Sequence, residues 1–179
     1  MNETGHPWYL EERIPFQKEL ALVFSRSKNG EFVHYPLAQF ESEQGICSTV
    51  FVEGTNSGLM AELEKQASAI ARDLSLKLNW CGTAAIEFFF SEQNGLMINE
   101  FAPRVHNSGH FTLTASQTSQ FENHMRAISG MPLGSCQTSP FAIMKNLLGT
   151  RDSKKVIAPE PTEGVEVFWY GKKEIRPGR

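Results

Sequence analysis

The stretch CGTAAIEFFFSEQNGLMINEFAPR, residues 81–104, decides the fold that we expect for this chain. It holds two runs rich in β-branched and aromatic residues, separated by the polar turn Gln-Asn-Gly at 93–95. Such runs on either side of an Asn-Gly turn are typical of an antiparallel hairpin. Each run also carries one glutamate among apolar neighbours, Glu87 in the first and Glu100 in the second. We therefore expect a hairpin with one carboxylate on each strand.

The two glutamates lie at similar distances from the turn, so their side chains can meet on one face of the hairpin. Two like charges placed in this way destabilise a sheet unless a cation lies between them, and Mg²⁺ prefers oxygen ligands of this kind. Asn99, next to Glu100, offers an amide oxygen to the ion or to a phosphate. The spacing leaves a second interpretation open, in which one glutamate faces solvent and the other pairs with Arg104.

A cluster of polar side chains follows the hairpin directly. The stretch 104–110, Arg-Val-His-Asn-Ser-Gly-His, holds a guanidinium, two imidazoles, an amide and a hydroxyl. Arginine suits bidentate recognition of carboxylate, bicarbonate or phosphate, and histidine exchanges protons near neutral pH. Either histidine alone is more simply explained as a hydrogen-bonded loop residue. The whole cluster, placed directly after the glutamate pair, favours a binding site.

The remaining segments predict an α+β fold. Extended runs at 8–14, 19–26, 31–40 and 46–54 predict strands, with a type I′ turn at Asn29-Gly30 between the second and third. Apolar residues at intervals of three or four predict a helix from Ser57 to about Leu78, capped by Asn56 or Ser57. The stretch 105–115 is predicted to be a loop, and 119–129 a second helix that Gly130 and Pro132 end. Short strands are expected again at 141–149 and 165–171.

Composition excludes several classes of protein. With 40% hydrophobic and 21% charged residues over 179 residues, the chain has the composition of a globular protein. A net charge of −3 gives no general attraction to nucleic acid or anionic lipid. Three widely spaced cysteines without a CxxC pattern, no apolar run of about 20 residues and no signal peptide predict a cytoplasmic protein. We therefore expect neither nucleic acid nor a membrane as a partner.

Several stretches closely resemble one family. The stretches INEFAPRVHNSGHFT (98–112) and TSQFENHMRAISGMPLG (118–134) are similar to the ATP-grasp 5-(carboxyamino)imidazole ribonucleotide synthases of purine biosynthesis. WYLEERIPFQKELALVFSR (8–26) resembles the family's adenine-binding hinge, and VFWYGKKEIRPGR (167–179) its C-terminal signature. The resemblance covers nearly the whole chain in collinear order.

The resemblance implies an ATP-dependent carbon–nitrogen ligase that uses ATP and Mg²⁺. Bicarbonate attacks the γ-phosphate of ATP to give carboxyphosphate, whose CO₂ is captured by the amine of 5-aminoimidazole ribonucleotide, with ADP and phosphate as the other products. The expected partners are therefore these small molecules, and the family is typically homodimeric. Phosphoryl transfer of this kind depends mainly on positioning and on charge neutralisation.

The resemblance also implies roles for individual residues. Glu87 and Glu100 match the family's Mg²⁺ ligands, with Asn99 beside them on the ATP side. The adenine and ribose contacts would come from Glu11, Glu12, Arg13, Ile14 and Glu19. The loop residues Arg104, His106 and Asn107 match catalytic groups, and Ser108, Lys173, Arg176 and Arg179 match substrate contacts. Without the resemblance, Glu19 is more simply explained as a solvent-facing strand residue, and the basic end of the chain as a solvated terminus.

The chain also departs from the family pattern. Ser42 stands where the family commonly has a histidine ahead of Gly45-Ile46, and no glycine-rich phosphate-binding loop of the GxGxxG or GxxxxGK type occurs. We expect residues 1–134 to form the C-terminal lobe of an ATP-grasp domain and 135–179 a truncated small β-rich domain. The chain would then be about half of an enzyme and inactive by itself. Another ATP-grasp enzyme, such as a formate-using transformylase or a biotin carboxylase, and a non-catalytic fragment remain alternatives.

Overall fold

The structure is a computed structural model that describes residues 10–43, 45–149, 160 and 162–171. Its centre is an antiparallel sheet of seven strands in the order β6-β5-β1-β3-β4-β7, with β2 paired to β1 beside this path. The strands are β1 (Lys18–Arg26), β2 (Phe32–His34), β3 (Ala38–Glu43), β4 (Ile46–Glu53), β5 (Gly82–Ser91), β6 (Gly95–Ala102) and β7 (Phe141–Lys145). The expected α+β fold is confirmed.

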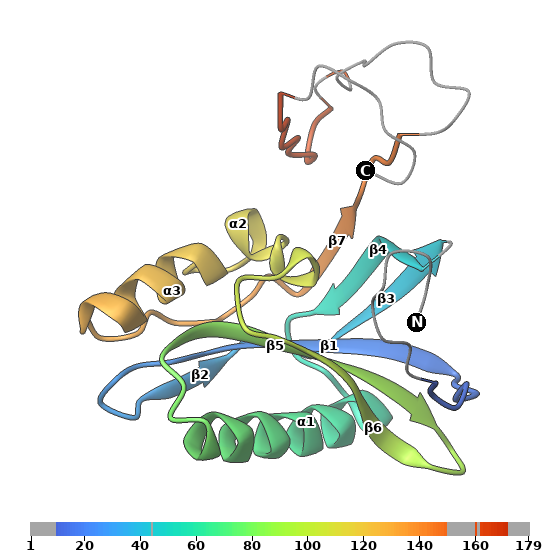
Figure 1. Cartoon of the computed structure of the whole chain (residues 1–179). Helices are drawn as coiled ribbons and strands as arrows, with labels where there is room; N and C mark the ends of the chain where they lie inside the picture. Colours follow the sequence, from blue (N-terminus) through green and yellow to red (C-terminus); the bar gives the residue numbers. More distant parts are fainter. Residues whose placement is uncertain (1–9, 44, 150–159, 161, 172–179) are drawn as a thin grey trace, which may run out of the picture.

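Helices cover both faces of this sheet (Figure 1). The long helix α1 (Gly58–Lys77) lies on one face, and α2 (Thr112–Ala115) and α3 (Gln120–Ser129) lie on the other. A short 3₁₀ helix, η1 (Asn107–Gly109), precedes α2. None of the helices in the described ranges is long and apolar enough to cross a membrane.

The strands β1 and β5 form the middle of the sheet and pair along their length, from Lys18 opposite Phe90 to Arg26 opposite Gly82. Residues 20–26 of β1 are all buried, because packed elements cover both faces of this strand. A strand covered on both sides reads as a continuous apolar run, which explains the sequence LALVF at 20–24.

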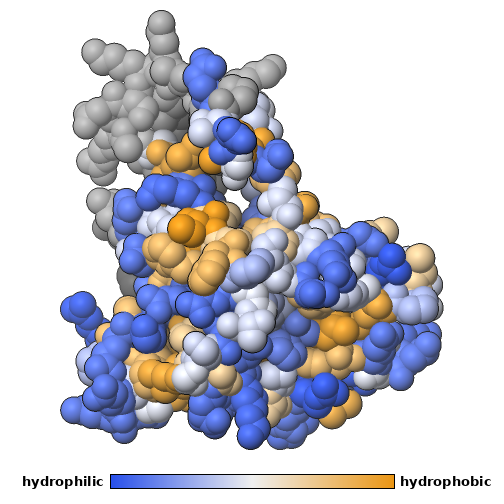
Figure 2. Space-filling model, turned by 180° about the vertical axis from the view of Figure 1, so that it is seen from behind, coloured by the Kyte–Doolittle hydropathy of each residue, from blue (hydrophilic) through white to orange (hydrophobic). Residues whose placement is uncertain are grey.

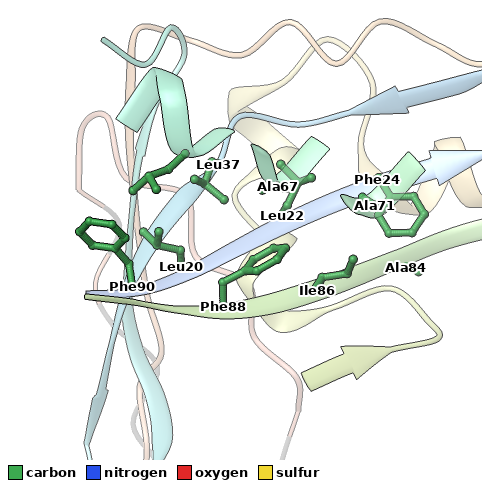
Figure 3. Close-up of a cluster of buried hydrophobic side chains, with 11 residues drawn as sticks. Leu20, Leu22, Phe24, Leu37, Ala67, Ala71, Ala84, Ile86, Phe88 and Phe90 are labelled. Carbon is green, nitrogen blue, oxygen red and sulfur yellow. The ribbon is translucent and has the colours of Figure 1, made fainter. Parts of the chain in front are cut away.

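The main core lies between the central strands and α1. Leu20, Leu22 and Phe24 of β1 point towards the helix, as do alternate residues of β5 (Figure 3). The helix meets them with Leu63, Ala67 and Ala71, which are spaced by about one turn and are at most 3% exposed. The small alanine side chains allow the helix to approach the sheet closely. The predicted helix at 57–78 is therefore confirmed, with Ser57 at its N-cap position but without a side-chain cap hydrogen bond.

The turn between β1 and β2 differs from the predicted type I′ turn. Gly30 N–H donates to the Ser27 carbonyl at 3.0 Å, and Gly30 has a φ of 88°. Asn29 does not have a positive φ, since Asn79 is the only non-glycine residue with one among the residues described. A three-residue loop that ends in a left-handed glycine joins the strands instead. A two-residue loop and a three-residue loop with the same Asn-Gly pair cannot be distinguished by composition.

Four further segments differ from the sequence prediction. The expected strand at 31–40 is interrupted at 35–37, where Pro36 has no N–H to continue the ladder. Of the expected strand at 8–14, residues 10–14 are described and form no strand. The stretch 105–115, predicted to be a loop, contains η1 and α2, which are too short to produce a helical period. Of the expected strand at 165–171, only Val165 takes part in strand pairing, through an isolated bridge with Thr162.

The helix α3 was predicted closely, and its ends show why. Ser119 is the N-cap, and its hydroxyl accepts from the Glu122 N–H at 3.1 Å. Gly130 ends the helix in a left-handed conformation with φ 73°. The side that faces the sheet includes two fully buried amides, Gln120 and Asn123.

The last strand in the described ranges, β7, extends the same sheet. β7 lies within the predicted strand at 141–149 and pairs with β4 from Phe141 opposite Glu53 to Lys145 opposite Thr49. Residues 135–179 were predicted to form a separate small domain, and that boundary stays a prediction.

Candidate functional site

The glutamate pair lies where the hairpin spacing predicted. Glu87 on β5 and Glu100 on β6 are direct Cα partners. The register shifts between Glu87 and Phe88, so β6 has one extra residue at this point, Asn99. A bulge of this kind bends the strand and redirects its side chains. Consequently Ile98, Asn99 and Glu100 are all exposed, while Glu87 is largely buried, with 17% of its side chain accessible.

A third carboxylate shares this face of the sheet. Ala21 on β1 is opposite Glu87, and Glu19 lies two residues earlier on the same strand, so it points to the same side. Glu19 accepts a hydrogen bond from the Ser42 hydroxyl at 3.3 Å. Hence three carboxylates lie on the face that α1 does not cover. Spacing alone suggested only two of them, because the partner of β1 could not be deduced from sequence.

On this face, burial and the negative charges of the carboxylates outweigh the positive charge of Arg104 at Glu87. Burial, followed by the negative charges of Glu100 and Glu19, raises the pKa of Glu87 to about 7, although Arg104 opposes the shift. Burial also raises the pKa of Glu19, opposed by the Ser42 hydrogen bond. The pKa of the nearby Cys47 thiol rises to about 11 because of its burial and the charges of Glu87 and Glu19. Glu87 and Cys47 therefore experience the negative charge of neighbouring carboxylates, whereas the pKa of Glu19 rises through burial.

A divalent cation would relieve this repulsion. Within the described ranges, no group of three or more histidine, cysteine, aspartate or glutamate side chains is arranged to hold a metal ion by itself. Magnesium does not require such a group, because it commonly binds one or two carboxylates together with water and substrate phosphate oxygens. The donors present, two carboxylates and the neighbouring Asn99 amide, are the hard oxygens that Mg²⁺ prefers. The residues therefore fit this ion.

His106 approaches the pair from the segment after β6. Its Nε2 lies 3.5 Å from Oε1 of Glu87. Its Nδ1 lies 2.8 Å from the Ser108 hydroxyl and 3.4 Å from the Ser108 N–H, which can only donate. Nδ1 is therefore the acceptor, and the proton of the neutral ring is on Nε2, facing Glu87. Burial and then Arg104 lower the pKa of His106, so this is a polar contact rather than an ion pair.

The other residues of the polar cluster surround His106. Arg104 is exposed, and its Nη1 donates to the Val105 carbonyl at 3.0 Å. Asn107 is half-buried at the start of η1. His110 Nδ1 donates to the carbonyls of His106 and Asn107 at 3.0 and 3.1 Å. The structure thus brings the predicted loop residues to the carboxylate face as one folded segment.

The predicted hinge residues lie at the entrance to β1. Glu11, Glu12 and Arg13 are exposed, and Ile14 is half-buried. Arg13 and Ile14 help to line an open cavity of about 280 Å³ together with Pro15 and Phe16. Phe16 stacks on Phe89 of β5, with ring centroids 4.4 Å apart. Because Phe89 is two residues from Glu87 on the same strand, this stack holds the hinge beside the carboxylate face.

Other predicted residues lie outside the structure's description. Lys173, Arg176 and Arg179 are all beyond residue 171, the last residue described. The segment just before them does approach the site, because the rings of Tyr170 and His110 are 6.5 Å apart.

Sequence reasoning missed Gln120. This residue is fully buried, and its amide bonds both the N–H and the carbonyl of His106. Glutamine is usually exposed, so composition gives no sign of this contact. The only available signal was the position of Gln120 inside the family-like stretch 118–134.

Comparison with known families agrees with this geometry. Residues 1–121 match the ATP-grasp domain, and the chain belongs to this family. Residues 142–179 match the phosphoribosylaminoimidazole carboxylase C-terminal domain, which indicates the particular kind of ATP-grasp protein. The resemblance inferred from the sequence is thereby confirmed.

Individual relatives agree as well. The N5-carboxyaminoimidazole ribonucleotide synthase of Synechococcus elongatus is 41% identical over 97% of this chain and 44% of its own length. That of Bacillus subtilis is 38% identical over 95% of this chain and 44% of its own length. This chain thus spans less than half the length of these relatives.

Solved structures show the same fold. The N5-carboxyaminoimidazole ribonucleotide synthetase of Thermus thermophilus is 38% identical, with a TM-score of 0.82, over 93% of this chain and 45% of that one. The Aspergillus clavatus synthase in complex with ADP and 5-aminoimidazole ribonucleotide is 30% identical, with a TM-score of 0.67, over 76% of this chain and 36% of that one.

Proposed function

We propose that this chain supplies the metal-binding and acceptor-binding part of an ATP-dependent ligase that carboxylates 5-aminoimidazole ribonucleotide with bicarbonate. The observation that carries the proposal is the pairing of Glu87 with Glu100, with His106 Nε2 at 3.5 Å from Glu87. Relatives that share this fold include a synthase solved with ADP and 5-aminoimidazole ribonucleotide. The whole reaction also needs groups that this chain does not provide, in particular a glycine-rich phosphate loop.

In this proposal the carboxylates act on the nucleotide side. Glu87 and Glu100, helped by the Asn99 amide, would hold Mg²⁺, which neutralises charge on the ATP phosphates during transfer. Their bulged hairpin presents one carboxylate from a buried position and one from an exposed position, so a phosphate can reach the solvent-facing side. The backbone of 11–14 would bind the adenine edge, and Glu19 the ribose hydroxyls.

The loop residues act on the bicarbonate side. The exposed guanidinium of Arg104 suits two-point recognition of bicarbonate or carboxyphosphate. His106 is held neutral and presents a proton on Nε2, so it can donate a hydrogen bond to an anionic oxygen without adding a full charge. Asn107 and Ser108 would contribute to binding of the aminoimidazole substrate. Lys173, Arg176 and Arg179 would hold the 5′-phosphate of the nucleotide. A homodimer and a cytoplasmic location also stay predictions.

The decisive experiment measures bicarbonate-dependent ATP hydrolysis in a chimaera, in which this chain replaces the matching part of the Synechococcus elongatus synthase. Glu100→Gln should lower the rate by at least about 100-fold, because it removes one charged ligand from the ion. Glu92→Gln, in the exposed turn of the same hairpin, is the matched control and should leave the rate within about twofold. Retained turnover in Glu100→Gln would refute the metal assignment.

Isotopic labelling separates this reaction from that of a related ligase. Label from bicarbonate should appear in the aminoimidazole product. Incorporation of label from formate instead would favour a formate-using transformylase and would contradict the proposal.

A further inference from the structure

One buried amide outside the proposed binding groups holds the segment that carries His106. Gln120 is the first residue of α3 and is 0% exposed. Its Oε1 accepts from the His106 N–H at 2.9 Å, and its Nε2 donates to the His106 carbonyl at 2.7 Å. Both polar atoms of the Gln120 amide are therefore hydrogen-bonded to the backbone of His106.

The backbone of Gln120 is in turn fixed to β5. The Thr83 hydroxyl donates to the Gln120 carbonyl at 3.0 Å, so the Ser25 hydroxyl, 2.6 Å from Thr83 Oγ1, must donate to Thr83. The Gln120 N–H donates to Thr112 Oγ1 at 3.0 Å. Thr83 lies four residues before Glu87 on the same strand. A continuous chain of hydrogen bonds thus connects the strand of Glu87 to the backbone of His106.

The space around the amide admits little alternative packing. A Cβ at Gly109 would lie 2.7 Å from Gln120 Oε1 and 2.8 Å from its Cδ. Real Cβ atoms do not approach this closely, so any side chain at 109 would displace the amide. Gly109 is therefore required here by space, and the segment 106–109 lies directly against Gln120.

We infer that Gln120 is a positioning residue, which fixes the backbone of His106 so that the imidazole faces Glu87 across the gap between β5 and η1. Its consequence for catalysis rests on the function proposed above. The position of the His106 backbone does not depend on that function, because contacts within this chain alone determine it.

The same helix offers a matched control. Asn123 is also a fully buried amide, and its Oδ1 accepts from the Gly134 N–H at 2.8 Å. Its Nδ2 donates to the Tyr35 hydroxyl at 2.9 Å. Asn123 therefore fixes the segment after α3, whereas Gln120 fixes the segment before α2.

The test is a crossed hydrogen-exchange measurement on this chain by NMR. Gln120→Met and Asn123→Leu each replace an amide with an apolar side chain of similar size. Gln120→Met should speed exchange of the His106 amide by at least about tenfold and leave the Gly134 amide unchanged, because a lost hydrogen bond of about 1.4 kcal/mol corresponds to a factor of ten. Asn123→Leu should do the reverse. Unchanged exchange at His106 in Gln120→Met, or equal changes at both amides in both variants, would overturn the inference.

A second variant reaches the same contact from the other side. Gly109→Ala should displace the Gln120 amide and speed exchange at His106, even if Gln120→Met does not fold. Protection of His106 equal to that in the unsubstituted chain would contradict the inference.

The catalytic consequence is measured in the chimaera described above. Gln120→Met should lower kcat by about 100-fold, the scale of a misplacement of about 1 Å, while the KM for MgATP stays within about twofold. Asn123→Leu should lower Tm by a similar amount to Gln120→Met but leave kcat within about threefold. If both variants lose kcat equally, the role of Gln120 is merely structural. If the unsubstituted chimaera fixes no bicarbonate, the proposed function fails, while the exchange experiment still decides the position of His106.

Discussion

Glu87 shows how a single residue acquires unusual properties from its neighbours. Its strand buries it, its cross-strand partner Glu100 repels it, and Glu19 adds a second negative charge on the same face. A carboxylate in these surroundings is disfavoured in its charged form unless a cation is present. The pKa of about 7 therefore supports the proposal that Glu87 binds a cation.

The raised pKa predicts how stability depends on pH in the metal-free chain. Because the folded state binds the Glu87 proton more tightly than the unfolded state, its contribution is fully present below about pH 4.5 and is lost as the pH rises through about 7. Glu87→Gln should therefore stabilise the metal-free chain at pH 8, by roughly 1–3 kcal/mol, and have little effect at pH 4. Urea unfolding at both pH values measures this difference. Adding Mg²⁺ at pH 8 should stabilise the unsubstituted chain and not the variant, and equal stabilisation of both would contradict the metal assignment.

At the scale of elements, the hairpins show which parts of a turn a sequence specifies. The Gln-Asn-Gly turn between β5 and β6 was predicted, and so was the approach of the two glutamates. The regular register that starts with Ser91 opposite Gly95 would place Asn99 opposite Glu87, and the bulge brings Glu100 there instead. The Asn29-Gly30 pair predicted the right hairpin with the wrong turn. In the structure only the glycine of this pair has a positive φ.

This turn provides a conformational prediction. Gly30 has a φ of 88°, and a Cβ there would meet nothing closer than Arg26 Nη2 at 3.9 Å. Gly30→Ala should therefore destabilise the chain by about 1–2 kcal/mol through backbone strain alone. Asn29→Gly should not increase the free energy of unfolding, because Asn29 has a negative φ and glycine only adds entropy to the unfolded state. Thermal or urea unfolding of both variants tests the turn type, and a stabilising Asn29→Gly would favour the type I′ geometry.

At the scale of the whole molecule, the sheet gives each face a different task. One face packs against α1 and forms the core with Leu20, Leu22 and Phe88. The opposite face carries the three carboxylates at one end and receives α2, α3 and the His106 segment (Figure 1). One face thus contributes core packing, whereas the other combines a second hydrophobic core cluster with the candidate chemistry.

The surface also carries uncovered apolar residues. Figure 2 shows hydrophobic side chains in several separate patches among hydrophilic ones on the face turned away from Figure 1. At the sheet edge, Phe141 and Ile143 of β7 are 77% and 70% exposed. Large exposed apolar residues at an edge strand are typical of surface that another segment or partner covers.

The missing phosphate loop leads to a prediction for the whole chain. The isolated 179 residues should show no bicarbonate-dependent ATP hydrolysis with Mg²⁺ and 5-aminoimidazole ribonucleotide, because no glycine-rich loop in the sequence can enclose the phosphates. Phosphate release over several hours measures this directly, with the chimaera as the positive control. Turnover by the isolated chain would show that the loop is dispensable, and calorimetry with MgADP would show whether the hinge alone binds nucleotide.

The sequence by itself determined the local features of this protein: the hairpin with one glutamate on each strand, the two main helices, the polar cluster after the hairpin and the family to which the chain belongs. These features depend on short-range periodicity, turn chemistry and motifs, which neighbouring residues specify. Only the tertiary structure decided that β1 pairs with β5, that Glu19 joins the carboxylates and that Gln120 holds His106. Such contacts join residues far apart in sequence, and they form because burial in a packed sheet requires each strand and each buried amide to find a partner.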